Sequence, residues 1–492
     1  MTSRLIITAV TAAAAMTAYA QQPSLRIYSG APDTVRAEKT VLVAVTDPGC
    51  TATVNSKPVH VYKTGSFGTQ LDLTPGLNTV DIAVSNTSGT TTRQLNIFCA
   101  PAQQNTNPDR EQSLRQDATL AYDAPFFVLT KPGAYLQYGN GDDRLGGSKM
   151  GFIDADIPLK VIGVKGSLYC VRLASGRIAY IPKYYTEKTD RTTHVVNTGS
   201  WSVANMGKSD RVTVSLPVRL AYQYSTNLDP STITIDIFGA TDNSNWITQR
   251  SLELGAIAYV DFQQVSDDVY RVIIHLKDKY NWGFRVYYPD NSNNLTVDVR
   301  HTPQSLSLKN LTIGLDAGHG GPYPGARSPS GILEKDVNLD IVLRMDRLLR
   351  KRGAKTVLSR DGDTGPSMAD RKKIFADANV DLAISVHNNS GGSALSSPGT
   401  SVLYKHLFDR PLSECVLRRM VGTGLPLFGL VGNFNFSLNA PTLYPNTLVE
   451  GMFMSSLAEE EKLADPEFRQ KVAEQLVAGI EDYLQLVAKS RK

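Results

Sequence analysis

Four side chains in the C-terminal third of the sequence have the chemical types needed to bind and use a metal ion. They are His319, Glu334, His387 and Glu450, and each stands beside small or polar residues on a separate segment. Two imidazoles and a carboxylate make a catalytic zinc site whose fourth position stays open for water, and a further carboxylate can move the protons of that water. A lone His or Glu is usually structural or solvated. The prediction of a Zn²⁺ site therefore rests on the ordered set of four.

The elements that must position these residues alternate between strands and helices after residue 307. Val337, Ile341, Met345 and Leu348 have the spacing of one helical face. Ser367 can cap a second helix through residue 379, and a last helix is expected from residue 465. Strands are expected at 311–315, 355–359, 382–386, 400–404 and 447–449. The pattern predicts a three-layer α/β domain over residues 305–492, with His387 and Glu450 at strand ends, where such sheets bind ligands.

The sequence before residue 305 predicts three all-β modules. Apolar residues alternate with period two in each of them, as at Ile233, Ile235 and Ile237. Residues 21–100 resemble an immunoglobulin-like sandwich, and residues 119–190 resemble an SH3-like barrel of the bacterial cell-wall type. With Trp282-Gly-Phe-Arg-Val-Tyr-Tyr288 and Leu295-Thr-Val-Asp-Val-Arg300, residues 191–304 resemble an AMIN module. The polar segment 101–118 reads as a linker.

Five tyrosines of the second module allow two interpretations. They can belong to the core and rim of the barrel, which is the plainer interpretation, or they can stack on sugar rings. They are Tyr135, Tyr138, Tyr180, Tyr184 and Tyr185.

The start of the chain predicts export. Arg4 precedes an apolar stretch at 5–18, and a small-x-small cleavage site ends at Ala20, so residues 1–20 read as a signal peptide. A membrane anchor is the alternative, but the stretch is shorter than the ~20 residues that a spanning helix needs. No later apolar run is long enough to span a bilayer. We expect an exported protein, periplasmic or in the cell envelope, without an integral membrane segment after cleavage.

Composition excludes few functions. The chain has 492 residues, 41% of them hydrophobic, which is ordinary for a globular protein of several domains. A net charge of +4 gives no indication of nucleic-acid binding.

Cys50 and Cys99 lie near the two ends of one predicted module, where they could form a disulfide or be small buried hydrophobic residues. No Gly-x-Ser-x-Gly motif indicates a serine nucleophile.

The segments around the four metal-site residues share short runs of glycine, histidine and acidic residues: Asp316-Ala-Gly-His-Gly-Gly321, Glu334-Lys-Asp336, Ser385-Val-His387 and Leu448-Val-Glu450. With these motifs, residues 309–487 resemble the zinc-dependent N-acetylmuramoyl-L-alanine amidases. The resemblance implies His319, Glu334 and His387 as zinc ligands and Glu450 as the catalytic carboxylate. It also implies peptidoglycan as the substrate, cut at the amide between N-acetylmuramic acid and the first L-alanine of the stem peptide.

The sequence departs from the family around Glu450. The glycine that follows this residue is displaced to Gly451, and Ser456 stands where the family has asparagine. Substrate contacts are expected from Arg327, Arg360 and Asn389. Arg371 is a further candidate for stem-peptide carboxylates, although an arginine on a helix is more often structural. Some relatives carry a long helical insert that covers the zinc until a partner removes it, and this chain has little room for one. Whether it needs an activator protein stays open.

Two other functions are compatible with the sequence. A non-catalytic wall-binding or activator protein could keep the amidase fold, although such relatives typically lose a ligand or the final glutamate. A zinc peptidase that cuts within the stem peptide is the second alternative, favoured only by the altered surroundings of Glu450.

Overall fold

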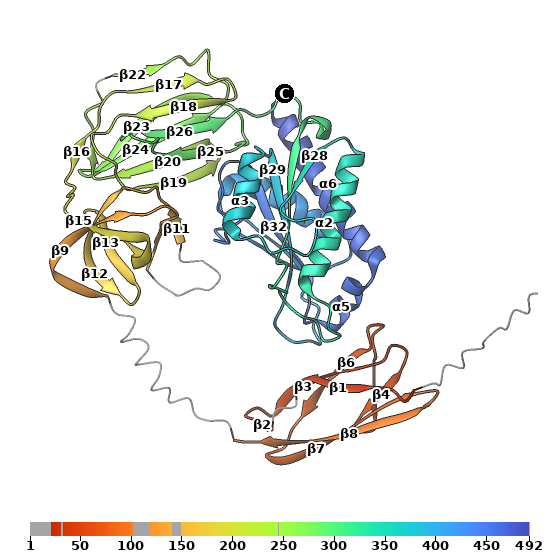
Figure 1. Cartoon of the computed structure of the whole chain (residues 1–492). Coiled ribbons are helices and arrows are strands. Elements are labelled where there is room, and N and C mark those ends of the chain that lie inside the picture. Colours follow the sequence, from red (N-terminus) through yellow and green to blue (C-terminus); the bar gives the residue numbers. More distant parts are fainter. Residues whose placement is uncertain (1–20, 31–32, 102–118, 140–148, 245, 492) are drawn as a thin grey trace, which may run out of the picture. The chain divides into compact units, whose positions relative to one another are not determined.

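The computed structural model describes residues 21–30, 33–101, 119–139, 149–244 and 246–491. The chain is mostly β strands with a few helices, arranged in several sheets (Figure 1). It divides into two compact units, Met1–Gln103 and Gln104–Lys492. The predicted signal peptide and all but the first residue of the predicted linker lie outside the described residues. Among the described residues, no helix is long and apolar enough to cross a membrane.

The first unit consists of two β sheets around a small core. Their strand orders are β1-β3-β6 and β2-β8-β7-β4-β5. Val80, Ile82 and Val84 of β7 enter the core as their alternation predicts. On β3, the alternation of Val41, Val43 and Val45 predicts the same, but the residues in the core cluster are Leu42 and Ala44 between them. The strands are β1 Leu25–Ser29, β2 Thr34–Val35, β3 Lys39–Thr46, β4 Thr51–Val54, β5 Lys57–Val59, β6 Ser66–Asp72, β7 Gly76–Asn86 and β8 Gly89–Cys99.

The two cysteines of this unit are not bonded to each other. Cys50 and Cys99 are both buried free thiols, and so are Cys170 and Cys415 in the second unit. Cys99 Sγ lies 3.7 Å from the carbonyl oxygen of Ala37, as a weak donor. The disulfide alternative is therefore wrong, and these residues act as small buried hydrophobic groups.

The β part of the second unit has one continuous hydrophobic core. A seven-stranded sheet has the order β11-β10-β14-β13-β12-β9-β15. A five-stranded sheet, β22-β17-β18-β26-β25, and a four-stranded sheet, β19-β20-β24-β23, follow it. Ile233, Ile235 and Ile237 are fully buried, as predicted. The strands of the seven-stranded sheet are β9 Leu120–Thr130, β10 Tyr135–Gln137, β11 Lys149–Phe152, β12 Pro158–Lys165, β13 Leu168–Ala174, β14 Arg177–Pro182 and β15 Thr186–Thr189. Those that follow are β16 Val196–Asn197, β17 Trp201–Asn205, β18 Ser209–Val214, β19 Tyr222–Leu228, β20 Ser231–Phe238, β21 Ala240–Thr241, β22 Ile247–Gln249, β23 Ile257–Ser266, β24 Val269–Leu276, β25 Phe284–Tyr287 and β26 Leu295–Arg300.

The C-terminal domain is built on a six-stranded mixed sheet of order β28-β27-β29-β32-β30-β31. Ser367 caps α3 as predicted, and Asp370 completes a capping box. The prediction missed α4, α5 and β31. The strands are β27 Thr312–Ala317, β28 Lys355–Leu358, β29 Leu382–Asn389, β30 Thr400–Leu403, β31 Leu427–Val431 and β32 Asn446–Phe453. The helices are α2 Glu334–Lys351, α3 Met368–Asp377, α4 Arg410–Val421, α5 Leu457–Ala464 and α6 Pro466–Ser490.

Helices cover both faces of this sheet. Successive strand residues point to opposite faces. Ile384 of β29 packs with residues of α2, α4 and α6, while its neighbour Ala383 packs with Phe375 of α3. Figure 1 shows α3 on one side of the sheet and α2 and α6 on the other. The C-terminal domain therefore has the three layers that the sequence predicts.

The core of the C-terminal domain also contains residues from the preceding β segment. Trp282 and Tyr280 belong to the same apolar cluster as the sheet and α6. The Trp282 ring is stacked on Tyr483 of α6, with ring centroids 6.2 Å apart and planes 9° apart. Trp282 thus contributes to the core of a domain that the sequence places after residue 304.

Replacing Trp282 with alanine should destabilise the chain strongly. Trp282 is 1% exposed, and removing a buried tryptophan side chain typically costs about 3–5 kcal/mol of unfolding free energy. Trp246 is 70% exposed, so Trp246→Ala should change that free energy by less than about 1 kcal/mol. Urea unfolding of both variants measures the difference. Equal losses of unfolding free energy in the two variants would contradict a role for Trp282 in the core.

Candidate active site

Three parallel strands bring the predicted metal residues to one edge of the sheet. β27 and β32 both pair in parallel with β29, and His387 is the register partner of Glu450. His319 lies two residues after the end of β27, and Glu334 is the first residue of α2. All four residues therefore meet at the carboxyl ends of the strands, where α/β sheets bind ligands.

Three of the four residues form a cluster that can hold a metal ion. His319, Glu334 and His387 each offer one ligand atom, and these atoms lie within 4.8 Å of one another. His319 Nε2 is 3.2 Å from Glu334 Oε2, and His387 Nδ1 is 3.2 Å from Glu334 Oε1. Two imidazole nitrogens and one carboxylate oxygen are the donor set of a catalytic metal site with an open position. The residues present therefore fit the ion that the sequence predicts.

The backbone around the cluster is fitted closely to these side chains. His319 has φ 61°, a left-handed conformation that is uncommon for a residue other than glycine. Gly325 has φ +69°, and a Cβ there would lie 2.4 Å from Glu334 Oε2. A Cβ at Gly318 would lie 2.3 Å from the His387 ring. Larger residues at either glycine would displace a ligand of the cluster.

Hydrogen bonds hold the Glu334 carboxylate in place. Its Oε1 accepts from the backbone N–H of Asn388 at 3.1 Å and from the Asn338 side chain at 3.1 Å, and its Oε2 accepts from the Ala326 N–H at 2.9 Å. Burial opposes ionisation, but hydrogen bonds from His319 and His387 hold the pKa of Glu334 well below its usual value. Glu334 is therefore an oriented anion, as a metal ligand must be.

Glu450 differs from Glu334 because one of its oxygens is unpaired. Its Oε2 is buried and has no hydrogen-bond partner among the described residues. Burial raises the pKa of Glu450 to about 7, against the attraction of His387. A buried carboxylate without a donor is costly and usually has a functional explanation. Glu450 has the position and the proton affinity of an acid/base group beside the cluster.

The displaced glycine after Glu450 has a structural reason. A Cβ at Gly451 would lie 2.9 Å from Asn388 Oδ1. That oxygen accepts a hydrogen bond from the Met452 N–H at 3.1 Å, and the Asn388 amide also donates to Asn338 Oδ1 at 2.8 Å. Gly451 thus lets β32 approach the asparagine that supports Glu334.

A buried ion pair lies beneath the cluster. Arg371 Nη1 donates to Asp316 Oδ1 at 2.7 Å, both side chains are 1% exposed, and Arg371 also donates to the carbonyl oxygen of His319. Ser385 Oγ donates to Asp316 Oδ2 at 2.6 Å. Burial opposes ionisation of Asp316, yet Arg371 holds its pKa below the usual value. Arg371 is structural, as predicted, and fixes the backbone that carries His319.

Removing the negative charge of this pair should destabilise the domain. Asp316→Asn leaves Arg371 buried without a counter-charge, which typically costs about 3–5 kcal/mol of unfolding free energy. The matched control is Asp377→Asn, which breaks the exposed pair between Asp377 and Lys373 on α3 and should cost less than about 1 kcal/mol. Chemical unfolding of both variants gives the comparison. Similar losses of unfolding free energy in the two variants would show that burial does not make the Asp316–Arg371 pair more important for stability than the exposed pair.

The three predicted substrate residues have different surroundings. Arg360 is 4% exposed and donates to the backbone carbonyls of Ala317, Gly318, Gly362 and Lys335. This placement favours a structural role for Arg360 over substrate binding. Arg327 is exposed, in the loop between His319 and Glu334, and Asn389 is half-buried at the end of β29. Both lie on segments next to the cluster.

Glu459 of α5 is a supporting acid that was not predicted from the sequence. Its side chain is fully buried, and its oxygens accept from the N–H groups of Gly399 at 2.7 Å and Phe453 at 2.6 Å. It thereby fixes the end of β32 after Glu450. Ser456 caps α5 by accepting from the Glu459 N–H. That cap is the sequence signal that could have predicted α5.

Together, the sheet edge, the His/Glu/His cluster and the unpaired glutamate define an α/β domain with a candidate metal-assisted hydrolase site. Residues 313–482 match the family model for N-acetylmuramoyl-L-alanine amidase. This match supports a cell-wall amidase catalytic domain in the C-terminal part of the chain.

Several known proteins are similar to a part of this chain of about the same length. The chain is 32% identical over 194 residues to the N-acetylmuramoyl-L-alanine amidase LytC of Bacillus subtilis (strain 168), which covers 37% of this chain and 38% of LytC. It is 29% identical over 199 residues to the germination-specific N-acetylmuramoyl-L-alanine amidase of the same strain, which covers 37% of this chain and 83% of the relative. The solved structure of the N-acetylmuramoyl-L-alanine amidase AmiC2 of Nostoc punctiforme has 30% identity and a TM-score of 0.34, and covers 36% of this chain and 97% of that one.

Proposed function

We propose that the chain is a zinc-dependent N-acetylmuramoyl-L-alanine amidase that hydrolyses the amide between N-acetylmuramic acid and L-alanine in peptidoglycan. The observation that carries the proposal is the cluster of His319, Glu334 and His387 beside the unpaired carboxylate of Glu450. The match of residues 313–482 to the amidase family supports it. The retained glutamate also separates this chain from a wall-binding protein that has lost its catalytic group.

The residues of the site have separate roles in amide hydrolysis. His319, Glu334 and His387 would hold the zinc ion, with Asn338 and Asn388 keeping Glu334 oriented. When bound, zinc supplies a water of pKa about 7 and a Lewis acid for the substrate carbonyl. Glu450 takes the proton of the attacking water and returns it to the leaving nitrogen of L-alanine. A pKa of about 7 suits a group that must do both near neutral pH.

The rest of the chain is proposed to deliver this domain to the cell wall. Residues 1–20 would direct export to the periplasm or cell envelope. Residues 21–100 would form an immunoglobulin-like module, 119–190 an SH3-like module and 191–304 an AMIN-like module. Arg327 and Asn389 would contact the substrate beside the zinc.

Mass spectrometry of digested cell wall tests the proposed function. The purified chain should release stem peptides with a free L-alanine amino terminus and leave glycan strands with a free lactyl carboxylate. Cuts within the stem peptide would instead identify a zinc peptidase. Binding to the wall without any new terminus would identify a non-catalytic wall-binding protein.

A further inference from the structure

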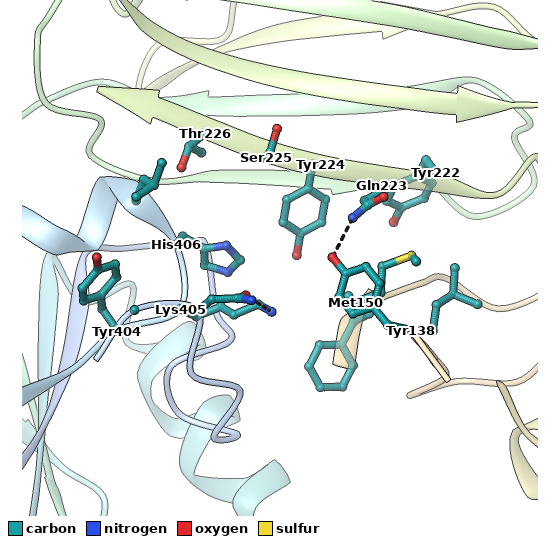
Figure 2. A pocket seen from close by; sticks show the side chains of 16 residues that line it. Tyr138, Met150, Tyr222, Gln223, Tyr224, Ser225, Thr226, Tyr404, Lys405 and His406 are labelled. Carbon is teal, nitrogen blue, oxygen red and sulfur yellow. Dashed lines mark hydrogen bonds between the residues drawn. The ribbon is translucent and has the colours of Figure 1, made fainter. Parts of the chain in front are cut away.

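A pocket outside the metal cluster lies between three parts of the second unit. It has a volume of about 380 Å³, near the lower end of the roughly 300–1,000 Å³ of small-molecule sites. Its walls come from the β10–β11 region, from β19, and from the loops after β30 and β31. Figure 2 shows the side chains of Tyr138, Tyr224, Lys405 and His406 facing the same space.

This pocket is separate from the metal cluster. β30 runs antiparallel to β32, with Ser401 opposite Glu450 and Leu403 opposite Leu448. Lys405 and His406 follow the end of β30, so the chain has moved away from Glu450 toward the opposite edge of the sheet. A ligand in this pocket therefore lies at the other edge of the sheet from the catalytic groups.

The ammonium group of Lys405 lines the pocket, and the positive charge of Lys149 lies near it. Lys405 Nζ donates to the carbonyl oxygen of Lys149 at 3.2 Å and to Asn433 Oδ1 at 3.1 Å. Lys372 Nζ lies 4.9 Å from the centroid of the Phe152 ring. Burial, together with the nearby charge of Lys149, lowers the pKa of Lys405 to about 8 and also lowers the pKa of Lys372. Among the described residues, both hydrogen-bond acceptors of Lys405 Nζ are uncharged oxygens. Repelling cations without a counter-charge form a site that an anion would stabilise.

Neutral polar groups and aromatic faces line the rest of the pocket. Thr226 is 9% exposed, and its Oγ1 is buried without a hydrogen-bond partner among the described residues. Burial lowers the pKa of His406 to about 4, so its ring is neutral; Nε2 donates to the Ala440 carbonyl at 3.1 Å, which leaves Nδ1 as an acceptor. The rings of Tyr138 and Tyr224 form apolar faces beside these groups (Figure 2).

We propose that this pocket binds a carboxylate-bearing sugar, with the carboxylate on Lys405, the sugar hydroxyls on Thr226 and His406, and the ring against Tyr138 and Tyr224. The volume suits a single sugar unit. The choice of a sugar acid among anions rests on the proposed function, because hydrolysis of the muramoyl amide leaves a lactyl carboxylate on each cleaved sugar. The pocket would then retain the chain on glycan that has already been cut.

Calorimetric titration of the full chain with N-acetylmuramic acid tests the proposal. N-acetylglucosamine supplies the ring without the carboxylate, and the dipeptide L-alanyl-D-glutamate and inorganic phosphate supply the charge without the ring. N-acetylmuramic acid should bind at least about tenfold more tightly than each of the three. Equally tight binding of N-acetylglucosamine would overturn the proposal that Lys405 binds the carboxylate. Equal binding of phosphate or the dipeptide would overturn the sugar.

Variants locate the binding. Lys405→Met keeps an apolar stem but removes the charge, so affinity for N-acetylmuramic acid should fall at least about tenfold. Thr226→Val removes only the hydroxyl and should weaken binding several-fold. The matched control, Lys351→Met at the exposed end of α2, should leave affinity unchanged. Unchanged affinity in a folded Lys405→Met protein would sink the proposal.

Binding and turnover report separately on the two sites. Glu450→Gln should bind N-acetylmuramic acid as tightly as the unaltered chain, because Glu450 lies at the other edge of the sheet. A chain that binds the sugar but does not cut peptidoglycan would contradict the proposed function and leave the pocket intact. A chain that cuts peptidoglycan but does not bind the sugar would contradict the pocket alone.

Discussion

The double variant His319→Ala, His387→Ala should contain no zinc and should have no detectable amidase activity. Both imidazoles reach the Glu334 carboxylate at 3.2 Å, and their removal leaves one oxygen ligand where a catalytic zinc site needs three protein ligands. Even the loss of a group that only supports a ligand typically lowers metal affinity 10–100-fold. Elemental analysis of the purified chain should find about one zinc in the unaltered protein and none in the variant.

A matched control separates the loss of ligands from the loss of histidine as such. His60 is exposed in the first unit, so His60→Ala should keep both zinc and activity. Stoichiometric zinc in the double variant would show that the zinc is bound elsewhere in the chain.

Glu450→Gln should retain zinc while turnover falls by roughly 10²- to 10⁴-fold, the usual contribution of a positioned acid/base group. Glutamine keeps the size of the side chain but can neither take nor return a proton. Steady-state rates on soluble muropeptides and elemental analysis of the same samples measure both effects. Glu414→Gln, which changes an exposed glutamate paired with Arg410, should leave both unchanged.

Two other outcomes would redefine Glu450. Loss of zinc in the glutamine variant would make it a ligand. Full activity would place the proton carrier elsewhere, but Asp316 already pairs with Arg371 and Ser385. Glu334 likewise accepts hydrogen bonds on both oxygens. Among these three acids, only Glu450 has an oxygen without a partner in the described part of the chain.

Local sequence patterns predicted the elements that carry the site. In β29 a buried apolar run precedes His387, and in β32 a buried run precedes Glu450. Ser367 with Asp370 marks the start of α3. Because parallel strands align their carboxyl ends, the meeting of His387 and Glu450 could be expected. The three-layer arrangement of the C-terminal domain was predicted on the same basis and is confirmed.

Contacts between distant segments could not be predicted in this way. The bond from Glu459 to the end of β32 depends on how α5 packs. The burial of Arg360 depends on backbone carbonyls at the end of β27, in α2 and in the loop after β28. Alternation on β3 marks two faces but does not say which one is covered. Cys50 and Cys99 stand near the ends of one module, yet only the fold determines whether their sulfur atoms meet.

The stacking of Trp282 on Tyr483 bears on how such chains can be recombined. A crossover at residue 305 would join the amidase domain to a foreign module that lacks the indole, leaving a gap beside α6 and an exposed apolar face. A recombined chain must therefore keep the β segment that carries Trp282 together with the C-terminal domain. The first unit is compact by itself, so exchange at residue 103 would leave both hydrophobic cores whole. Chimeras built from this chain should be joined there.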